Sequence, residues 1–393
     1  MDKELHEVLR IFEKITKIPH CSGKTEELRE FIKDFAKNFG YEVEVDGVGN
    51  VLATLQNPKI CLQSHYDMVC VGKAPDIEIV EKEGWLMAKE SSLGADNGIG
   101  VAIMLYFMTQ KLPLEFLFTN DEEIGLIGAF NLELKIKSKY LLNLDSEDEN
   151  IYIGSAGGVD AKIRYPKSTK TVFGTKGEIK IDKLPGGHSG VDIDKNIPNA
   201  IVELLKRVNK TAYIKGGERR NSIPVSALSV EVFEGDEEIE VYDEKYIHFL
   251  RELPHGVLEI DFKYEVPSKS VNFALIDGFE TVLSLRANSN EKLQELKRYV
   301  LSKAKDAEVE FEGEYPAWAP EENRLVKMLQ KITSKELKVI HAGLECGILK
   351  NKLNVDVASF GPVIQNPHSV RERVNIESVG RVLKWLEELI KEI

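Results

Sequence analysis

Acidic and histidine side chains recur in this sequence directly after short apolar runs or beside glycines. They occur in the segments LQSHYD, LGADNG, TNDEE, LNLD and NPHS. Carboxylates that gather in one place repel each other, and their burial is costly unless a cation balances the charge. If the fold brings these segments together, the sequence therefore predicts a metal site. In chain order the side chains concerned are His65, Asp67, Asp96, Asp121, Glu122, Glu123, Asp145 and His368.

Imidazoles and carboxylates without cysteine suit zinc, with manganese or cobalt as alternatives, because imidazole favours these metals over magnesium. Two divalent cations would account for the number of groups. Asp96 can bridge the cations, His65 and Asp145 can complete one site, and Glu123 and His368 can complete the other. Two dications then balance three carboxylates and a bridging hydroxide. Cations about 3.5–4 Å apart would turn a shared water into a nucleophile.

The remaining acids of these segments have different predicted roles. Glu122 is the neighbour of the ligand Glu123, and it would stay free to take a proton from the water as general base. Asp67 follows His65 by two residues and can orient it by accepting its second ring N–H. For Asp121 we expect only solvation.

Each of these motifs is weak by itself. A histidine at a strand end is commonly a hydrogen-bonded structural residue, and an acidic triplet is commonly a solvated loop. The segment GADNGIG resembles a phosphate loop, but it lacks the Lys-Ser/Thr pair and follows two serines rather than a strand, so no nucleotide site is predicted. The prediction of a metal site therefore rests on the whole set.

Apolar runs and helical patterns alternate in the segments that carry these residues. Strands are predicted at 59–65, 115–119 and 140–145, with helices near 95–110 and 125–133. This alternation is typical of an α/β fold with a mostly parallel sheet. Ligands of such sheets bind at the carboxyl ends of the strands, where most of the candidate residues fall.

The sequence changes character after Gly154. Residues 157–316 contain patterns typical of antiparallel strands with helices on one side, and the order strand, helix, strand occurs twice. The α/β pattern then returns. We therefore predict a discontinuous catalytic domain, residues 1–155 and 318–393, interrupted by an inserted α+β lid domain, residues 156–317.

Composition excludes several classes of protein. The 393 residues are 42% hydrophobic and 30% charged, as in globular proteins, and the net charge of -13 argues against nucleic-acid binding. No window approaches 18 uninterrupted apolar residues, so no membrane span is expected. The first residues read as an amphipathic helix without the pattern of a secretory signal. The predicted location is cytoplasmic.

The four cysteines are scattered and form no CxxC pair, so we expect neither a disulfide framework nor a structural zinc site. Cys61 and Cys346 are predicted to be small buried hydrophobic residues. Cys70 is predicted to be a buried neutral thiol.

Longer motifs give a resemblance to a known family. SHYDMV, SSLGADNGIGVA, TNDEEIGLIGA, LLNLDSED, LPGGHSG, RNSIP, HAGLECG and GPVIQNPHS occur in one order along the chain. In this the chain resembles the aminoacyl-histidine dipeptidases, a carnosinase-like branch of the co-catalytic dizinc exopeptidases that include peptidase T and the aminoacylases. GGHSG together with HAGLECG points most narrowly to the dipeptidase branch. The chain is shorter than is usual for that branch, and the difference falls in the lid.

The resemblance implies a dizinc catalytic domain, a lid that serves in homodimer formation, and the same metal ligands and base as above. It adds His188 and Asn221 of the lid, which would bind the scissile carbonyl or the terminal carboxylate of the substrate. Arg286 could bind that carboxylate, or it could be a solvated arginine. Glu345 could bind the free α-amino group, or it could brace a glycine-rich turn.

The function expected from these features is the metal-dependent hydrolysis of dipeptides, including Xaa-His, by a water that bridges two metals with Glu122 as general base. A tripeptide aminopeptidase or an N-acyl-amino-acid deacylase would use the same core and are the alternatives within enzymes. An inactive binding protein is the alternative outside them, but no ligand or base of the set is missing from the sequence.

Overall fold

The computed structural model describes residues 3–393, and the chain divides into two compact units. The first unit contains the described residues up to Ile153, together with Pro320–Lys338 and Leu344–Ile393. The second contains Gly154–Ala319 and Val339–Gly343. The units therefore change within two residues of the predicted boundaries, and the short return at 339–343 has no counterpart in the sequence prediction.

An eight-stranded sheet forms the centre of the first unit, in the order β1-β2-β6-β3-β7-β20-β8-β19. Its four inner strands β6, β3, β7 and β20 run parallel, which confirms the predicted α/β fold. β3 and β6 are buried at every residue, as their continuous apolar runs require. The strands are β1 (Glu42–Val45), β2 (Val51–Thr54), β3 (Cys61–His65), β6 (Glu115–Thr119), β7 (Tyr140–Asn143), β8 (Ile151–Ser155), β19 (Leu337–Ile340) and β20 (Asp356–Ser359).

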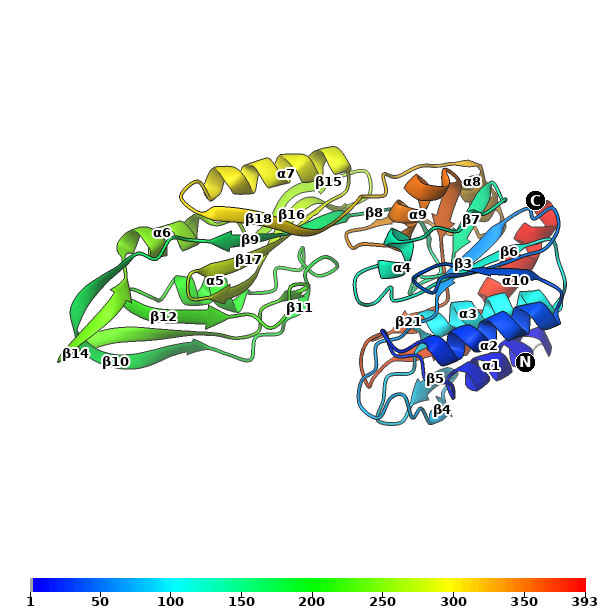
Figure 1. The fold of residues 1–393 in the computed structure, drawn as a ribbon, viewed down its shortest axis with the longest axis horizontal. Helices are drawn as coiled ribbons and strands as arrows, with labels where there is room; N and C mark the ends of the chain where they lie inside the picture. The colour runs from blue at the N-terminus through cyan, green and yellow to red at the C-terminus, as the bar shows by residue number, and fades with distance from the viewer. Residues whose placement is uncertain (1–2) are drawn as a thin grey trace. The chain divides into compact units, whose positions relative to one another are not determined.

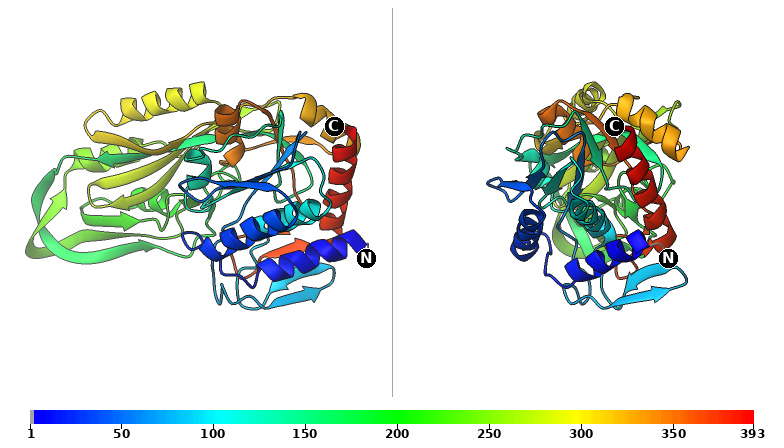
Figure 2. Two further views of the ribbon diagram at one scale, coloured as in Figure 1. Left: turned by 45° about the vertical axis from the view of Figure 1, so that its right-hand side comes forward. Right: turned by 90° about the vertical axis from the view of Figure 1, so that its right-hand side faces the viewer.

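Helices cover this sheet. α3 packs against β3 and is itself packed against α1 and α2, while α8 and α9 pack against β20; Figures 1 and 2 show these two groups on either side of the strands. The helix predicted near 125–133 is a single turn. The helices are α1 (Lys3–Ile15), α2 (Glu26–Asn38), α3 (Ala95–Thr109), α4 (Ile127–Phe130), α8 (Arg324–Thr333), α9 (Glu345–Leu353) and α10 (Ile376–Glu392).

A small antiparallel sheet also belongs to the first unit, in the order β21-β22-β5-β4. β21 and β22 pair with each other, so residues 366–372 form the loop of a hairpin. At the base of this loop the Arg373 guanidinium donates two hydrogen bonds to Gln365 Oε1 (2.9 and 2.6 Å) and lies over the ring of Trp85. The strands are β4 (Ile79–Lys82), β5 (Trp85–Ala88), β21 (Ile364–Gln365) and β22 (Arg373–Asn375).

The second unit is an antiparallel sheet with helices packed on it, as predicted. The strand order is β10-β14-β12-β16-β17-β9-β18, with β15 paired to β16 and a separate pair β11-β13. Helix α7 packs on β9 and β17, and α5 packs on β10 and β14. The elements are β9 (Gly157–Arg164), β10 (Thr169–Ile181), β11 (Gly187–His188), α5 (Ala200–Leu205), β12 (Thr211–Gly216), β13 (Ser222–Ile223), β14 (Ala227–Tyr242), α6 (Glu244–Glu252), β15 (Gly256–Asp261), β16 (Val266–Asp277), β17 (Glu280–Ala287), α7 (Asn290–Lys303) and β18 (Glu308–Tyr315).

The cysteines depart from the sequence prediction. Cys21 and Cys70 form a disulfide, with their Cα atoms 5.5 Å apart, so the predictions of no disulfide and of a neutral thiol at Cys70 were wrong. The two residues are separated by 49 positions, and only the fold brings their loops together. Cys61 and Cys346 are free and buried, as predicted.

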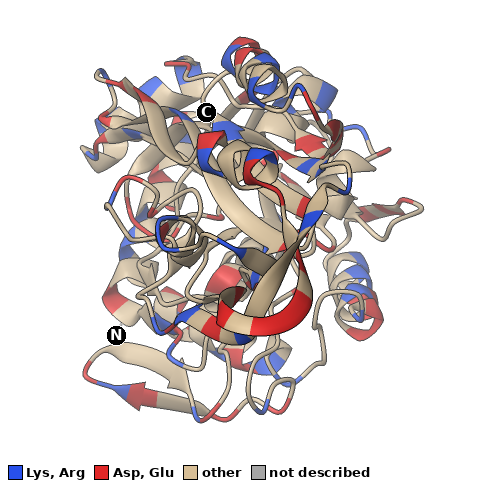
Figure 3. Cartoon of the chain, turned by 90° about the vertical axis from the view of Figure 1, so that its left-hand side faces the viewer, with Lys and Arg blue, Asp and Glu red and all other residues tan. Residues whose placement is uncertain are grey.

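Charge and hydropathy of the folded chain agree with its composition. Figure 3 shows lysine and arginine intermixed with aspartate and glutamate over most of the chain, with one long acidic stretch at the front of the view. Across residues 3–393 we find no helix with the length and apolarity that a membrane crossing demands.

Candidate metal centre and substrate site

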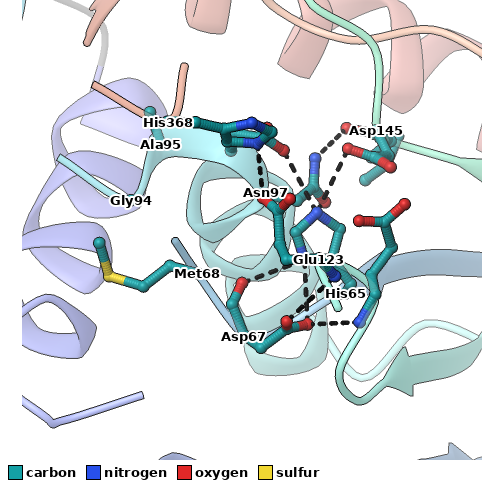
Figure 4. A network of polar contacts seen from close by, with 12 residues as sticks. His65, Asp67, Met68, Gly94, Ala95, Asn97, Glu123, Asp145 and His368 are labelled. Atoms are coloured by element: carbon teal, nitrogen blue, oxygen red, sulfur yellow. Dashed lines mark hydrogen bonds and ion pairs between the residues drawn. The ribbon is translucent and has the colours of Figure 1, made fainter. Parts of the chain in front are cut away.

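The first unit brings the five predicted metal ligands together at the carboxyl ends of its parallel strands (Figure 4). His65 is the last residue of β3, and Glu123 and Asp145 follow β6 and β7. Asp96 lies in the first turn of α3, and His368 lies in the β21–β22 loop. The strand-end rule for α/β sheets places the first three, while the other two arrive from a helix start and a hairpin loop.

Asp96 lies between the two histidines. Its Oδ1 is 3.2 Å from Nε2 of His65, and its Oδ2 is 3.1 Å from Nε2 of His368. Each oxygen thus faces a different imidazole. This is the arrangement that a carboxylate needs if it is to bridge two cations.

The other two carboxylates each lie near one histidine. Asp145 Oδ1 is 3.5 Å from His65 Nε2, and Glu123 Oε1 is 2.8 Å from His368 Nε2. The buried Oε1 of Glu123 nevertheless accepts no hydrogen bond from any described residue. Glu123 Oε1 and His368 Nε2 are thus close together without hydrogen-bond geometry. This is expected if both atoms direct a lone pair at the same cation, so the residues fit a metal pair.

His65 has the tautomer that a ligand requires. Its Nδ1–H donates to the backbone oxygen of Asp67 (3.0 Å), and the Asp67 carboxylate lies 3.3 Å from the same nitrogen. In the neutral ring the lone pair is therefore on Nε2, the atom that faces Asp96 and Asp145.

The pKa values of the cluster move as expected for acids crowded around bases without a cation. Burial raises the pKa of Glu123 to about 7, with the Asp96 charge as the second cause. Burial opposes protonation of His368, but its hydrogen bond to Asp96 and its close contact with the Glu123 carboxylate raise its pKa to about 11. Burial likewise opposes ionisation of Asp96, but hydrogen bonds from His368 and His65 hold its pKa far below the usual range. The site thus demands positive charge.

Glu122 lies next to this cluster, close to His65 but not in a group with His368. One of its carboxylate oxygens lies within 4.8 Å of ligand atoms of His65 and Glu123. Burial raises its pKa well above the ordinary range, and the nearby Glu123 and Asp145 charges add to the rise, while His65 opposes it. A base with a raised pKa beside the cluster is suited to proton transfer near neutral pH.

Asp67 connects the β3 end with the loop that carries Glu122 and Glu123. Its carboxylate is fully buried and accepts hydrogen bonds from the backbone N–H groups of Glu122 (2.9 Å) and Glu123 (3.3 Å). Ser22 Oγ donates a third at 2.7 Å. Asp67 therefore fixes the backbone of the predicted base as well as the ring of His65.

Asp121 differs from its prediction. Its side chain accepts hydrogen bonds from the Gly23 N–H (2.6 Å) and from Asn120 Nδ2 (3.0 Å), and its φ is +52°. It braces a tight turn rather than lying free in solvent, and the adjacent sequence gives no sign of this contact with residue 23.

Glu345 begins helix α9 and is completely buried. Gln63 Nε2 and Thr119 Oγ1 each donate to its Oε2 at 2.7 Å, while its Oε1 has no hydrogen-bond partner among the described residues. Burial raises its pKa to about 7. A buried carboxylate with one unpaired oxygen is suited to receive a cationic group of a ligand.

In the second unit His188 lies on β11, and Asn221 directly precedes the adjacent strand β13. His188 pairs with Ser222 in the β11–β13 ladder, and the Asn221 backbone oxygen accepts from the N–H of Ser189 (2.9 Å). His188 Nδ1 accepts hydrogen bonds from the N–H groups of Gly190 and Val191. Its ring proton therefore belongs on Nε2, which makes that atom a donor.

Arg286 is buried rather than solvated, with 9% of its surface exposed. Its Nη1 donates to Tyr315 Oη (2.6 Å) and its Nη2 to Ser189 Oγ (3.4 Å), but its Nε has no partner among the described residues. None of the described acidic residues forms an ion pair with it. A buried guanidinium without a counter-ion is a site for an anion.

His341 and Gly190 complete this group, and neither residue had a predicted role. His341 is buried, with Nε2 2.7 Å from Ser270 Oγ, and burial together with the Arg286 and His188 charges lowers its pKa to about 3. A Cβ on Gly190 would come within 2.3 Å of the His341 backbone oxygen and 3.1 Å of both Arg286 Nε and His188 Cε1. Only glycine lets these groups approach, and the last residue of the GGHSG motif was the available sign of it.

Comparisons with known proteins show which family and which proteins this chain is similar to. A family model described as peptidase family M20/M25/M40 matches residues 61–392. The cytosol non-specific dipeptidase of Escherichia coli (strain K12) is 31% identical over 468 aligned positions, covering 98% of this chain and 96% of the relative.

Solved structures give the same picture. Aminoacylhistidine dipeptidase from Vibrio alginolyticus superposes with a TM-score of 0.80 at 28% identity, covering 98% of this chain and 96% of that one. A tripeptidase from Staphylococcus aureus has a TM-score of 0.63 at 18% identity, covering 98% of each chain, which shows a shared fold.

Proposed function

The chain belongs to peptidase family M20/M25/M40, and from this membership we propose that it is a metal-dependent dipeptidase that hydrolyses the peptide bond of free-amine dipeptides. The near full-length similarity to a non-specific dipeptidase supports this substrate class. The likeness to an aminoacylhistidine dipeptidase supports Xaa-His dipeptides as one group of substrates.

The position of Asp96 is the main support for this proposal, because its two oxygens face one histidine each at 3.2 and 3.1 Å. His65 and Asp145 would hold one cation, Glu123 and His368 the other, and Asp96 both. The donor set favours zinc, with manganese or cobalt as alternatives. When bound, such cations polarise the scissile carbonyl and lower the pKa of the attacking water.

The chain's own residues would then move the proton. Glu122 would accept it from the attacking water and deliver it to the nitrogen of the leaving amine. Asp67 would hold the Glu122 backbone through its 2.9 Å hydrogen bond and so fix where that carboxylate lies.

Each unit, taken by itself, contains candidate substrate-binding groups. Arg286, with Tyr315 and His341 beside it, would bind the terminal carboxylate of the substrate, because its buried guanidinium forms no ion pair with any described acidic residue. Glu345 would bind the α-ammonium through its unpaired Oε1. His188, as a donor through Nε2, and Asn221 would contact the scissile carbonyl or the carboxylate.

We also propose a cellular location and an oligomeric state for this chain. The E. coli relative is named as a cytosolic enzyme, and we extend that location to this chain. We also propose a homodimer formed through the second unit, which light scattering of the purified protein would test.

The deciding experiment is a hydrolysis panel on metal-stripped protein to which zinc, manganese or cobalt is returned. The panel contains β-Ala-His, Gly-His, Leu-Gly, a tripeptide and N-acetyl-Leu. Cleavage of the three dipeptides only after metal is returned is the expected result. Activity confined to the tripeptide or to N-acetyl-Leu would assign a different substrate class, and no hydrolysis with any metal would contradict an enzymatic role.

A further inference from the structure

Glu372 is a buried carboxylate that makes four hydrogen bonds to one short segment of backbone. It is 2% exposed, and its two oxygens accept from the N–H groups of residues 93–96. The distances are 2.7 Å from Leu93, 3.0 Å from Gly94, 2.7 Å from Ala95 and 3.2 Å from Asp96.

The charge of Glu372 is compensated by these N–H groups alone. Among residues 3–393 no lysine or arginine forms an ion pair with it, and burial followed by the Asp96 charge raises its pKa. Burying a further acid close to the candidate metal ligands is costly. Its presence there calls for a role that a neutral side chain would not serve as well.

The segment that Glu372 holds is one that the helix does not hold by itself. Asp96 and Asn97 have non-helical backbone angles inside α3, with ψ of 107° at Asp96, and Gly94 has a φ of +71°. Backbone N–H groups at the start of a helix lack intrahelical partners. The position of Asp96 therefore depends on partners from outside the helix.

Glu372 also belongs to the hairpin loop that carries His368. It lies four residues after that histidine and directly before β22, with its N–H bonded to the Ser369 oxygen at 3.1 Å. One side chain thus joins two ligand-bearing segments that are 276 residues apart in sequence. Figure 4 shows Gly94 and Ala95 of the held segment beside His368.

We propose that Glu372 is a positioning residue that fixes Asp96 relative to His368. It thereby sets the affinity of the second metal site, the one that Glu123, His368 and the shared Asp96 would form. The inference rests on the proposed function, because it takes Asp96 and His368 as ligands. A residue that orients ligands from outside the coordination sphere contributes typically about 10- to 100-fold to metal affinity. The competing explanation is that Glu372 only stabilises the start of α3.

Glu115 provides a matched control for that explanation. It is also completely buried in the first unit, and its carboxylate accepts from the N–H groups of Lys137 (2.8 and 3.0 Å) and Ser138 (2.8 Å). It lies at the opposite end of β6 from the metal ligands. Glu115→Gln therefore removes a buried backbone-binding charge without touching the metal site.

Cobalt titration followed by calorimetry and visible absorption tests the proposal on metal-stripped wild type, Glu372→Gln and Glu115→Gln. We expect Glu372→Gln to bind its first cobalt as wild type does, to bind the second about 10- to 100-fold more weakly, and to show an altered cobalt spectrum. Glu115→Gln should bind both as wild type does, even where its unfolding midpoint falls equally.

Wild-type affinity and spectrum in Glu372→Gln, or the same loss in Glu115→Gln, would overturn the proposal. If Glu372→Gln does not fold, Glu372→Asp keeps the charge but is too short to reach all four donors, and unchanged second-site affinity in that variant overturns it as well. A wild-type protein that binds fewer than two cobalt ions would instead contradict the proposed function itself.

Discussion

Glu122 and Glu123 are adjacent residues with the same side chain in different positions. Glu123 contacts His368 at 2.8 Å, whereas Glu122 has His65 and Glu123 as its nearest candidate partners and a pKa raised by burial. A ligand loses its free lone pair to the metal, while a base must keep it. The two neighbours thus satisfy opposite requirements because the backbone turns between them, held by Asp67.

The Glu122→Gln variant tests this division of roles. It should keep the metal content of wild type and lose about 100- to 10,000-fold in kcat, since it can no longer take a proton. Metal analysis and steady-state rates on a dipeptide would be compared with Asp121→Asn in the same loop, which keeps its acceptor oxygen and should lose only a few fold. Near wild-type turnover in Glu122→Gln would exclude it as the base.

Arg286 offers a second test at this scale, with substrate chemistry as the control. Arg286→Gln should lower kcat/KM for a dipeptide acid by about 100-fold, because a buried charge pair is worth about 2–5 kcal/mol when one partner is removed. For the same dipeptide with a C-terminal amide, wild type and variant should differ little. Equal losses on acid and amide would make Arg286 a structural residue.

Residue types together with strand ends, a helix start and a loop indicated which side chains gather at the candidate metal centre, but their supporting residues were not predictable. Glu372, His341 and Tyr315 act on residues far away in sequence, for example across 276 positions for Glu372 and Asp96. Nothing in the neighbouring sequence marks such a contact. The burial of Arg286 was likewise open, because a lone arginine on a strand is compatible with either face.

At the scale of the elements, the strands were predictable from the sequence, whereas the links between the loops at residues 21–23 and 66–72 were not. Apolar periodicity predicted the strands, since burial on both faces of a parallel sheet demands continuous apolar runs. The two loops are joined by the Cys21–Cys70 disulfide and the Ser22–Asp67 hydrogen bond. The Gly23–Asp121 hydrogen bond ties the first of them to the loop after β6. These links depend on three-dimensional proximity, which is why the sequence prediction of unpaired cysteines was wrong.

Counting the reactive thiols tests for the Cys21–Cys70 disulfide directly. Protein unfolded in denaturant without reductant should show two reactive thiols, Cys61 and Cys346, and four after reduction. The Cys21→Ser/Cys70→Ser double variant should lose about 4 kcal/mol of unfolding free energy, because the cross-link closes a long loop in the unfolded chain. Four thiols before reduction would show that the bond is absent in the purified protein.

At the scale of the whole molecule, the cluster of acids makes stability depend on pH and on metal together. Glu345 is the clearest member, because it is completely buried and contacts none of the candidate ligands: its partners are Gln63 and Thr119. Burial raises its pKa from 4.5 to about 7, so the folded state favours the protonated form. The resulting stabilisation, about 3 kcal/mol, is fully present below pH 4.5 and is lost as the pH rises through 7.

The pKa values of Glu123 and His368 shift in the same direction, to about 7 and about 11, so both groups should lower the stability of the metal-free protein as the pH rises, Glu123 between pH 4.5 and 7 and His368 from pH 6.5 upward. The lowered pKa of the buried His341 acts in the opposite direction below pH 6.5. Bound dications favour the ionised carboxylates, and the same pH change should then have a much smaller effect. Thermal unfolding between pH 5 and 8, with chelator and with zinc, measures both slopes. Glu345→Gln carries no titrating proton, so in chelator its midpoint should fall less steeply than that of wild type; parallel curves would mean that Glu345 is already ionised in the folded protein, and the acid cluster would then have to be balanced by the two histidines alone.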